Sequence, residues 1–424
     1  MKNPLAWRNK KVCVIGLARS GFACANLLNQ LGASVSVTDN QLNQATEINA
    51  AKLKAKDIKV ELGKHSPGFI EGNDFLVVSP GVTDTSLPII RAKELGIPAI
   101  SEIELAWSLC PATVIAVTGT NGKTTVTTLI GKILEAKGKH VFVCGNIGTP
   151  FSAEVSRMSC DDFVSLEVSS FQLEKIVTFK PKVSVILNFS RNHLDRYLDM
   201  KGYLEAKKRI FMNQDNNDYL VLNSQDNFVN DLEKITGPKV VYFSEGEGLN
   251  PNQAAALTVG SLLGIEKELC FKVFDDFKGV EHRLEFVEEV NGIKFINDSK
   301  ATTVDSTVWA LKNVTGPVIL IAGGREKGND YTLILELVKE KVKEVILIGE
   351  AKERIKAALD GIIATRQAPS LEEAVRQAFA GARRGCVVLF SPMCKSFDMF
   401  NDYEHRGKVF KQAIYALAKS KNLV

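Results

Sequence analysis

Short apolar runs alternate with longer amphipathic stretches along most of the chain. In the N-terminal quarter, residues 19–31 repeat apolar positions with the period of a helix, and the runs around this stretch have the length of strands. A strand–helix–strand rhythm predicts mainly parallel sheets, because parallel neighbours need a crossover connection. The strands expected here are residues 12–15, 34–38, 75–78 and 98–100.

The same rhythm returns twice more, which predicts an α/β protein of three domains with three sheets. We place the domains at residues 1–111, 112–280 and 281–424, although no Pro/Gly-rich linker marks the last boundary. Helices are expected at 200–212, 333–342, 371–382 and 406–418. The remaining strands are expected at 115–117, 141–143, 163–166, 183–187, 219–222, 240–243, 293–296, 318–321, 345–348 and 387–390.

The most informative stretch follows the expected strand at 115–117. A glycine-rich turn leads into an amphipathic helix, which is the arrangement of a phosphate-binding loop. In such loops the backbone N–H groups surround the anion, a lysine adds charge, and a hydroxyl binds Mg²⁺. The residues concerned are Gly119, Thr120, Asn121, Gly122, Lys123, Thr124 and Thr125. Only two residues separate the glycines, fewer than in the usual loop, so a plain strand–turn–helix is the alternative.

A second glycine turn follows the first expected strand. Gly16, Arg19, Ser20 and Gly21 belong to an imperfect GxGxxG pattern, and Asp39 ends the next strand. This pattern fits NAD or another nucleotide diphosphate. Ser79 and Gly81 follow a later strand, where sheets of this kind bind ligands, although an ordinary turn explains them equally well.

Three polar residues of the middle region stand at expected strand ends: Asn146, Glu167 and His193. Since the carboxyl ends of parallel strands share one edge of a sheet, we expect these groups to converge on the phosphates. A carboxylate and an imidazole there suit Mg²⁺. Alternatively, Glu167 pairs with a lysine and His193 caps a helix.

Lys207 lies at the centre of the apolar stripe of the helix expected at 200–212, whereas Lys208 lies off it. Burial should lower the pKa of the Lys207 amine. A neutral amine can react with CO₂ to form a carbamate, an anion that can bind a metal. The alternative is a lysine that extends to solvent or pairs with an acid.

Composition excludes several classes of protein. The 424 residues carry 53 Lys and Arg against 49 Asp and Glu, and this balance predicts neither a nucleic-acid nor a membrane surface. No apolar run approaches membrane-spanning length, and the N-terminus lacks a signal core. The eight cysteines form no CxxC, so we expect reduced thiols and a cytoplasmic protein.

Taken together, the motifs TGTNGKTT, LEVSSFQLE, NHLDRY, EAKKRIF, EHR, NDSKAT and SPMCKSFD…YEHRG resemble the Mur ligase family over essentially the whole chain. The resemblance implies a Rossmann-like N-terminal domain for a UDP-sugar, a central P-loop-type ATPase domain and a Rossmann-like C-terminal domain. NDSKAT, SSFQLE and the tail resemble the glutamate-adding member. That member implies ATP, D-glutamate and UDP-N-acetylmuramoyl-L-alanine as substrates, two Mg²⁺ ions, and a monomer.

The resemblance also implies roles for residues at the matching positions. The Gly16–Gly21 turn, Asp39, Ser79, Gly81 and Asn146 would bind the UDP substrate, and the phosphate loop with Arg283 and Asp298 would bind ATP. Thr124, Glu167, His193 and a carbamylated Lys207 would bind metal. Lys300, Thr302, Lys327, Ser396 and Tyr403 would hold D-glutamate, with Lys123, His193, Lys207 and Lys300 closest to the chemistry. The expected adenine region reads Leu-Asn-Pro-Asn-Gln at 249–253 instead of the family's HNxxN, so its adenine contact stays open.

Family chemistry is carboxylate activation: the acceptor carboxylate attacks ATP to give an acyl phosphate, which the amine of the amino acid then attacks. Rival interpretations are another amide ligase of the family, including a folylpolyglutamate synthase-like enzyme, a nucleotide-dependent switch, and an NAD-dependent redox protein. The last two give no reason for charged groups at the strand ends of both the middle and the last region.

Overall fold

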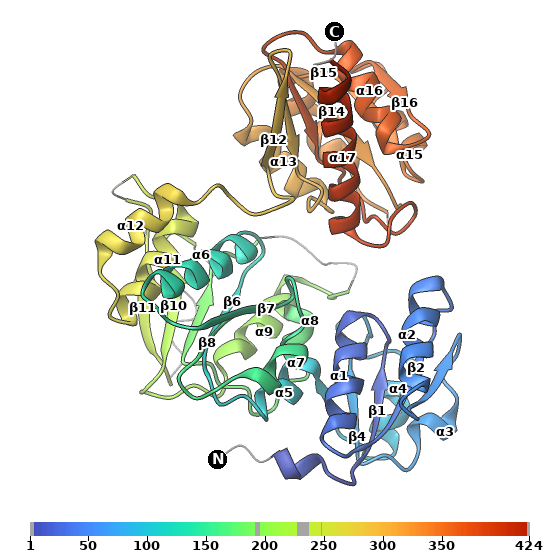
Figure 1. The fold of residues 1–424 in the computed structure, drawn as a ribbon, viewed down its shortest axis with the longest axis vertical. Coiled ribbons are helices and arrows are strands. Elements are labelled where there is room, and N and C mark those ends of the chain that lie inside the picture. Colours follow the sequence, from blue (N-terminus) through green and yellow to red (C-terminus); the bar gives the residue numbers. More distant parts are fainter. Residues whose placement is uncertain (1–3, 191–195, 227–236, 247, 327, 422–424) are drawn as a thin grey trace. The chain divides into compact units, whose positions relative to one another are not determined.

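The computed structural model describes residues 4–190, 196–226, 237–246, 248–326 and 328–421. Its strands form three sheets, the number that the sequence predicts, and these have five, six and six strands (Figure 1). The chain divides into two compact units, Met1–Phe277 and Lys278–Val424, and the first unit contains two of the sheets. The three domain boundaries stay predictions.

The first sheet is parallel throughout and has the order β3-β2-β1-β4-β5. Its strands are β1 (Lys11–Ile15), β2 (Ser34–Asp39), β3 (Lys59–Leu62), β4 (Phe75–Val78) and β5 (Ala99–Ser101). The sequence patterns did not predict β3, whose residues are exposed or only half-buried and so lack a core-facing run. The helices here are η1 (Pro4–Trp7), α1 (Arg19–Gln30), α2 (Gln44–Lys54), α3 (Pro67–Ile70), α4 (Leu87–Glu94) and α5 (Glu102–Trp107).

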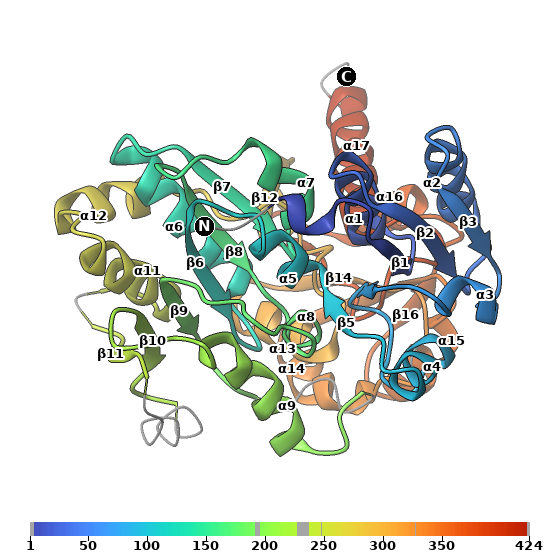
Figure 2. The ribbon, with the colours of Figure 1, turned by 90° about the horizontal axis from the view of Figure 1, so that it is seen from below.

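The central sheet is also parallel and has the order β11-β10-β9-β6-β8-β7. Its strands are β6 (Thr113–Thr118), β7 (Val141–Gly145), β8 (Phe163–Glu167), β9 (Val183–Ile186), β10 (Tyr219–Asn223) and β11 (Lys239–Phe243). The helices are α6 (Lys123–Ala136), α7 (Phe151–Glu154), η2 (Val155–Arg157), α8 (Ser170–Leu173), α9 (Met200–Lys208), η3 (Arg209–Phe211), α11 (Pro251–Leu262) and α12 (Lys267–Asp276). Figures 1 and 2 show α6, α11 and α12 on one side of this sheet and α8 and α9 on the other.

The sheet of the second unit has the order β12-β13-β17-β14-β15-β16, in which β12 alone runs antiparallel to its neighbour. Its strands are β12 (Glu285–Val290), β13 (Ile293–Asn297), β14 (Val318–Gly323), β15 (Val342–Ile348), β16 (Thr365–Gln367) and β17 (Val387–Phe390). Its helices are α13 (Val304–Asn313), η5 (Tyr331–Ile334), α14 (Leu335–Lys341), α15 (Lys352–Leu359), α16 (Leu371–Gly381) and α17 (Tyr403–Lys421). The charged edge strand β12 was not predicted.

Alternate residues of the inner strands belong to different hydrophobic cores. In β6, Val114 and Ala116 pack with α7 and α8, whereas Ile115 and Val117 pack with α6 and α11. Covering both faces explains why β6 reads as a continuous apolar run instead of an alternating one. The core that contains Val114 continues into the first sheet through Val12, which makes the first unit compact.

Two buried carboxylates of α5 also join the first two sheets. Glu104 accepts hydrogen bonds from the backbone N–H groups of Val177, Thr178 and Phe179, at 2.9, 2.7 and 3.0 Å. Glu102 accepts one from Ser152 N at 2.6 Å, near the start of α7. Because these acids accept hydrogen bonds from backbone N–H groups of the middle region, α5 links the first sheet to the central sheet.

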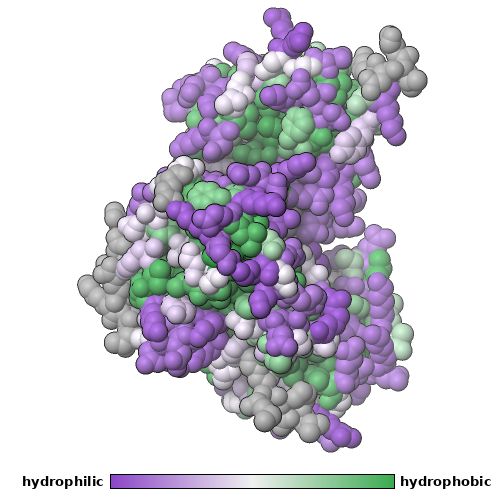
Figure 3. Space-filling view, turned by 60° about the vertical axis from the view of Figure 1, so that its left-hand side comes forward, coloured by the Kyte–Doolittle hydropathy of each residue, from purple (hydrophilic) through white to green (hydrophobic). Residues whose placement is uncertain are grey.

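The surface and the cysteines can be described for the ranges of the chain given above. On the face in Figure 3, hydrophilic side chains separate the hydrophobic patches. Within the described ranges, no helix combines the length and the apolar character needed to cross a membrane. All eight cysteines are free thiols.

Candidate active site

The predicted phosphate loop connects β6 to α6, where the sequence placed it. Gly119 and Gly122 have φ angles of +153° and +82°, a region that favours glycine. A Cβ on Gly122 would lie 2.3 Å from Asn252 Oδ1, and one on Gly119 would lie 3.0 Å from Leu187 Cβ. The turn therefore leaves no room for side chains, as expected where a backbone closely surrounds an anion.

Asn188, which the sequence reasoning overlooked, holds this loop in shape. Its Oδ1 accepts the Asn121 N–H at 2.8 Å, its Nδ2 donates to Asn121 O at 3.1 Å, and its own carbonyl accepts the Thr120 N–H at 3.1 Å. Asn188 comes just after β9, the neighbour of β6. That position next to the loop was the available signal.

Two lysine side chains contact the backbone of the loop. Lys123 Nζ donates to Gly119 O and Thr120 O at 2.9 and 3.0 Å, and Lys207 Nζ donates to Gly119 O at 2.9 Å. Lys207 is 1% exposed, whereas Lys208 is partly exposed and pairs with Glu205. Burial lowers the pKa of Lys207 well below the ordinary lysine value, and the charge of Lys123 lowers it further. The predicted position and electrostatics of Lys207 are thus present.

Glu167 and Asn146 converge at the same sheet edge, as predicted. Glu167 ends β8 and is paired in register with Val117 and Gly145. Asn146 Nδ2 donates to Glu167 Oε1 at 2.7 Å, and Thr124 is buried in the first turn of α6. A carboxylate and a hydroxyl beside an amide-lined loop form a donor set that suits Mg²⁺ with nucleotide phosphates. His193 lies outside the described residues.

Close backbone contacts and the Asp39 carboxylate fix the conformation of the first glycine turn, after β1. Gly16 has a φ angle of +94°, and a Cβ on Gly21 would lie 1.8 Å from Gly16 O. Asp39 accepts the N–H of Leu17 on Oδ2 at 2.6 Å and that of Gln41 on Oδ1 at 2.8 Å. Asp39 therefore fixes the backbone of the turn as well as lying beside it. Whether it contacts a ligand stays a prediction.

Beside this turn, a hollow of about 450 Å³ runs along α1 opposite α7. Arg19 lines it, and Arg19 Nη1 lies 3.4 Å from Gly148 O, just beyond Asn146. Ser20 follows Arg19 in the first turn of α1. The structure thus brings the first glycine turn close to the loop that carries Asn146.

The turn at Ser79 and Gly81 packs against the first glycine turn, since Ser79 Oγ donates to Gly16 O at 3.3 Å. Arg196 donates to Pro80 O at 2.8 Å and to Val82 O at 3.1 Å. The sequence reasoning gave Arg196 no role, although it lies within the quoted motif NHLDRY. The residues around Arg196 in the sequence form no pattern that would have singled it out.

In the second unit, Asp298 follows β13 and is buried. Its Oδ2 accepts the hydroxyl of Ser391 at 2.8 Å, and its Oδ1 accepts the N–H of Leu284 at 3.2 Å. Burial raises the pKa of Asp298 to about 7. Arg283, the other predicted nucleotide contact, influences this carboxyl electrostatically, and no described group bonds the buried Arg283 Nε. The two predicted residues are therefore neighbours.

The predicted glutamate-binding residues are partly brought together. Lys300 Nζ lies 5.4 Å from the ring centroid of Tyr403, and the Thr302 N–H donates to Lys300 O at 2.9 Å. Ser396 is buried on the loop after β17. Lys327 lies outside the described residues.

Arg406, another residue that the sequence reasoning missed, joins the two loops that carry these groups. It is fully buried, and its guanidinium donates to Ser299 Oγ and Ser299 O at 3.0 and 2.7 Å and to Cys394 O at 3.0 Å. A buried arginine is rare without such a role. The sequence alone places Arg406 in an amphipathic helix, where an arginine is usually exposed to solvent.

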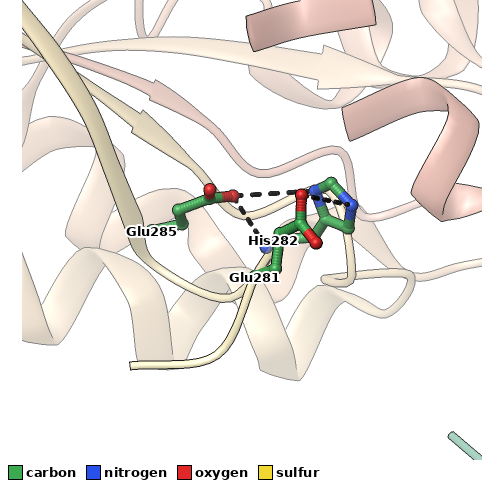
Figure 4. A group of neighbouring side chains, drawn as sticks. All are labelled: Glu281, His282 and Glu285. Carbon is green, nitrogen blue, oxygen red and sulfur yellow. Dashed lines mark hydrogen bonds and ion pairs between the residues drawn. The ribbon is translucent and has the colours of Figure 1, made fainter. Parts of the chain in front are cut away.

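One cluster in the second unit has the composition of a metal site but is already neutralised. Glu281, His282 and Glu285 lie together in Figure 4. Lys411 Nζ contacts Glu281 Oε1 at 2.5 Å and Glu285 Oε1 at 2.8 Å, and Asn297 Nδ2 donates to Glu285 Oε2 at 3.0 Å. Since an ammonium already bridges the two acids, we assign no metal there.

The expected adenine region forms the start of α11. Asn250 accepts the N–H groups of Asn252 and Gln253 at 3.0 and 3.1 Å, and Gln253 Oε1 accepts the Asn250 N–H at 3.1 Å. These side chains form a capping box. Asn252 lies against Gly122 of the phosphate loop, so the helix start and the loop are adjacent.

This fold and site define a class of protein: a multidomain α/β nucleotide-phosphate binder with acidic and basic groups at its strand ends. Family models match three regions, namely the Mur ligase MurD-like N-terminal domain at 10–101, the Mur ligase middle domain at 117–267 and the Mur ligase glutamate ligase domain at 282–394. The chain belongs to the Mur ligase family.

The curated relatives are matched over nearly their full length. The chain is 42% identical to UDP-N-acetylmuramoylalanine--D-glutamate ligase of Geotalea uraniireducens, over 96% of this chain and 98% of the relative. It is 40% identical to the Chloroherpeton thalassium enzyme of the same name, over 97% and 99%. The predicted family is thereby confirmed.

Two solved structures share the fold at low sequence identity. The UDP-N-acetylmuramate-alanine ligase MurC of Thermotoga maritima superposes with a TM-score of 0.62 at 17% identity, covering 96% of this chain and 99% of that one. E. coli FolC in complex with DHPP and ADP gives a TM-score of 0.57 at 17% identity, covering 74% and 92%. The three-domain α/β class predicted from the sequence is confirmed.

Proposed function

We propose that this protein is an ATP-dependent amide ligase that adds D-glutamate to UDP-N-acetylmuramoyl-L-alanine, a step of peptidoglycan precursor synthesis. The observation that carries the proposal is the phosphate loop at Gly119–Thr124, with Lys123, Glu167 and Lys207 around it. Relatives about 40% identical over almost the whole chain bear the name of that ligase. The free thiols support a cytoplasmic setting, and we expect a monomer.

The reaction we propose has two steps. The terminal carboxylate of the acceptor attacks the γ-phosphate of ATP, which forms an acyl phosphate and releases ADP. The amine of D-glutamate then attacks the acyl carbon, the amide bond forms, and inorganic phosphate leaves. One peptide bond and one proton are produced for each ATP cleaved.

Repulsion between anions is the main obstacle to the first step. At 4 Å and an effective dielectric near 20, one like-charge pair costs ~4 kcal/mol. The loop N–H groups and the ammonium of Lys123 offset this repulsion and favour the charge of the transferring phosphoryl group. Thr124 and Glu167 would hold Mg²⁺, which neutralises phosphate oxygens when bound.

Lys207 is proposed to act as a carbamate. Burial lowers the pKa of its amine and so favours the neutral form, which adds to CO₂ with loss of one proton to give an N-carboxylate. That anion would serve a second Mg²⁺ next to the phosphate loop, together with His193. Lys300, Tyr403 and their neighbours in the second unit are proposed to bind D-glutamate.

A phosphate-release assay with product analysis tests the function. With Mg²⁺, ATP, UDP-N-acetylmuramoyl-L-alanine and D-glutamate, we expect phosphate release and a product lengthened by one glutamate residue. L-glutamate, other amino acids and other UDP-muramoyl acceptors serve as controls, and a dihydropteroate acceptor with L-glutamate tests the folate-type alternative. Absence of both phosphate and lengthened product with D-glutamate would refute the proposal.

A further inference from the structure

Arg196, in the middle region of the chain, contacts the Ser79–Val82 turn after β4. We call this turn the acceptor turn. Its Nη1 donates to Pro80 O at 2.8 Å and its Nη2 donates to Val82 O at 3.1 Å. These two carbonyls flank Gly81. One planar guanidinium therefore fixes the backbone on both sides of that glycine.

The guanidinium is itself held in place. Its Nη2 contacts Glu174 Oε2 at 2.6 Å, and its Cζ lies 4.3 Å from the centroid of the Phe171 ring. The side chains of Arg196 and Glu174 are 14% and 19% exposed, so water screens this pair only partly. Because both Nη atoms of Arg196 donate to protein groups and Glu174 balances its charge, this arrangement suits orienting the turn.

The same carboxylate is linked onward to the phosphate-loop side. Glu174 Oε1 accepts the hydroxyl of Tyr197 at 2.6 Å. The Tyr197 ring lies 5.2 Å from the Tyr203 ring, and the Tyr203 ring lies 4.7 Å from Lys207 Nζ. A continuous set of contacts thus runs from the acceptor turn to the buried lysine.

We propose that Arg196 is a positioning residue that holds the acceptor turn in the geometry that binds the UDP-linked acceptor, a role that rests on the proposed function. Ser79 bonds the first glycine turn, so a fixed acceptor turn keeps both turns aligned. Loss of Arg196 lowers acceptor binding and leaves ATP binding intact.

Arg209 offers a matched control. Its guanidinium also donates to two backbone carbonyls: Nε donates to Leu173 O at 2.8 Å, and Nη2 donates to Ile176 O at 2.7 Å. Leu173 is the last residue of α8 and Ile176 follows it, and neither of these two bonds involves the acceptor turn. A change at Arg209 therefore removes the same kind of interaction without removing a bond to the acceptor turn.

The experiment compares R196M, R196K, E174Q and R209M with the unchanged protein in steady-state kinetics. We expect R196M to raise the acceptor KM about ten- to hundredfold, with kcat and the ATP KM within about threefold, since two charge-assisted bonds are lost. R196K should still raise the acceptor KM, because an ammonium on a flexible stem lacks the rigid planar fork that meets both carbonyls and Glu174 at once. E174Q should give a smaller rise, and R209M should leave the acceptor KM unchanged.

Two kinetic outcomes would overturn the proposal. An unchanged acceptor KM in R196M would show that the turn needs no support from Arg196. A normal acceptor KM in R196K would indicate a charge that binds the substrate directly.

Hydrogen–deuterium exchange without substrate separates this inference from the proposed function. Faster exchange at residues 81–84 in R196M, but not in R209M, is expected whatever the protein catalyses. If the unchanged protein makes no lengthened product, the function fails while this readout still tests the role of Arg196. Equal exchange in both variants would contradict that role.

Discussion

The first unit contains two glycine turns that start alike and differ in charge. Each follows an inner strand of a parallel sheet, leads into a helix, and begins with a glycine at positive φ, Gly16 or Gly119, where a Cβ would come within about 3 Å of a neighbouring side chain. After β1, the acid Asp39 accepts two backbone N–H groups. After β6, Lys123 and Lys207 donate to backbone carbonyls of the loop.

The difference shows how one backbone pattern serves two purposes. Asp39 uses up the Leu17 N–H, so the first turn has one fewer donor to offer an anion and gains a fixed shape. The second turn keeps its lysines at the sheet edge, next to Glu167. We therefore expect the first turn to contribute to acceptor binding and the second to phosphoryl transfer.

The largest effect should come from removing the lysines of the second turn. Lys123→Ala should lower kcat by about 10²–10³-fold, because an ammonium near the transferring phosphoryl group is lost. Lys207→Ala should lose most activity as well, and added short carboxylates should partly restore it by standing in for the carbamate. Phosphate release measures both, and circular dichroism checks the fold.

Rescue of Lys123→Ala by carboxylates, or full activity of either variant, would contradict the roles given to these lysines.

A moderate effect is expected at the first turn. Asp39→Asn replaces one acceptor oxygen by an NH₂ group facing a backbone N–H, which should raise the acceptor KM about tenfold and lower stability by about 1–3 kcal/mol. The ATP KM should not change. Initial-rate kinetics and urea unfolding measure these effects.

If Asp39→Asn raised the ATP KM and spared the acceptor KM, the division of labour between the turns would be wrong.

The smallest effect concerns a buried acid that is bonded less completely than Asp39. Burial raises the pKa of Glu102, and no described group bonds its Oε2. The folded state then keeps a proton that the unfolded chain has lost, so stability falls as pH rises from about 4.5 through the raised pKa. Glu102→Gln should remove this slope and change stability at pH 7 by less than ~1 kcal/mol.

Urea midpoints between pH 4.5 and 8 check this, provided that the unfolding transition is two-state. A slope retained in Glu102→Gln would assign the titration to another group.

Sequence patterning predicted the inner strands well, because both of their faces are buried and their apolar runs are unbroken. It failed for edge strands such as β3 and β12, which include charged residues and are mostly exposed or only half-buried. The helix expected at 200–212 ends at Lys208 and continues as the 3₁₀ turn η3. A change in helix type leaves no mark in the apolar period.

The candidate site was predictable where a motif carries its own chemistry. Lys123 and Lys207 were found from a glycine loop and from a lysine on an apolar stripe. Asn188, Arg196 and Arg406 were missed because their partners are backbone carbonyls and N–H groups far away in the sequence. When a polar side chain bonds backbone groups that are distant in the sequence, the residues around it look the same as those around an ordinary surface residue.

The first and central sheets share a hydrophobic core, and Glu104 forms hydrogen bonds across it. This shared core has a consequence for the length of the substrate. The acceptor turn and the phosphate loop belong to one compact unit, so we expect the span between them to be set before any molecule arrives. A compound that occupies both ends must match that span, and a chain shorter or longer by one amino acid would miss the reactive phosphoryl group. Selection by length would then come from the scaffold and not from any contact along the way.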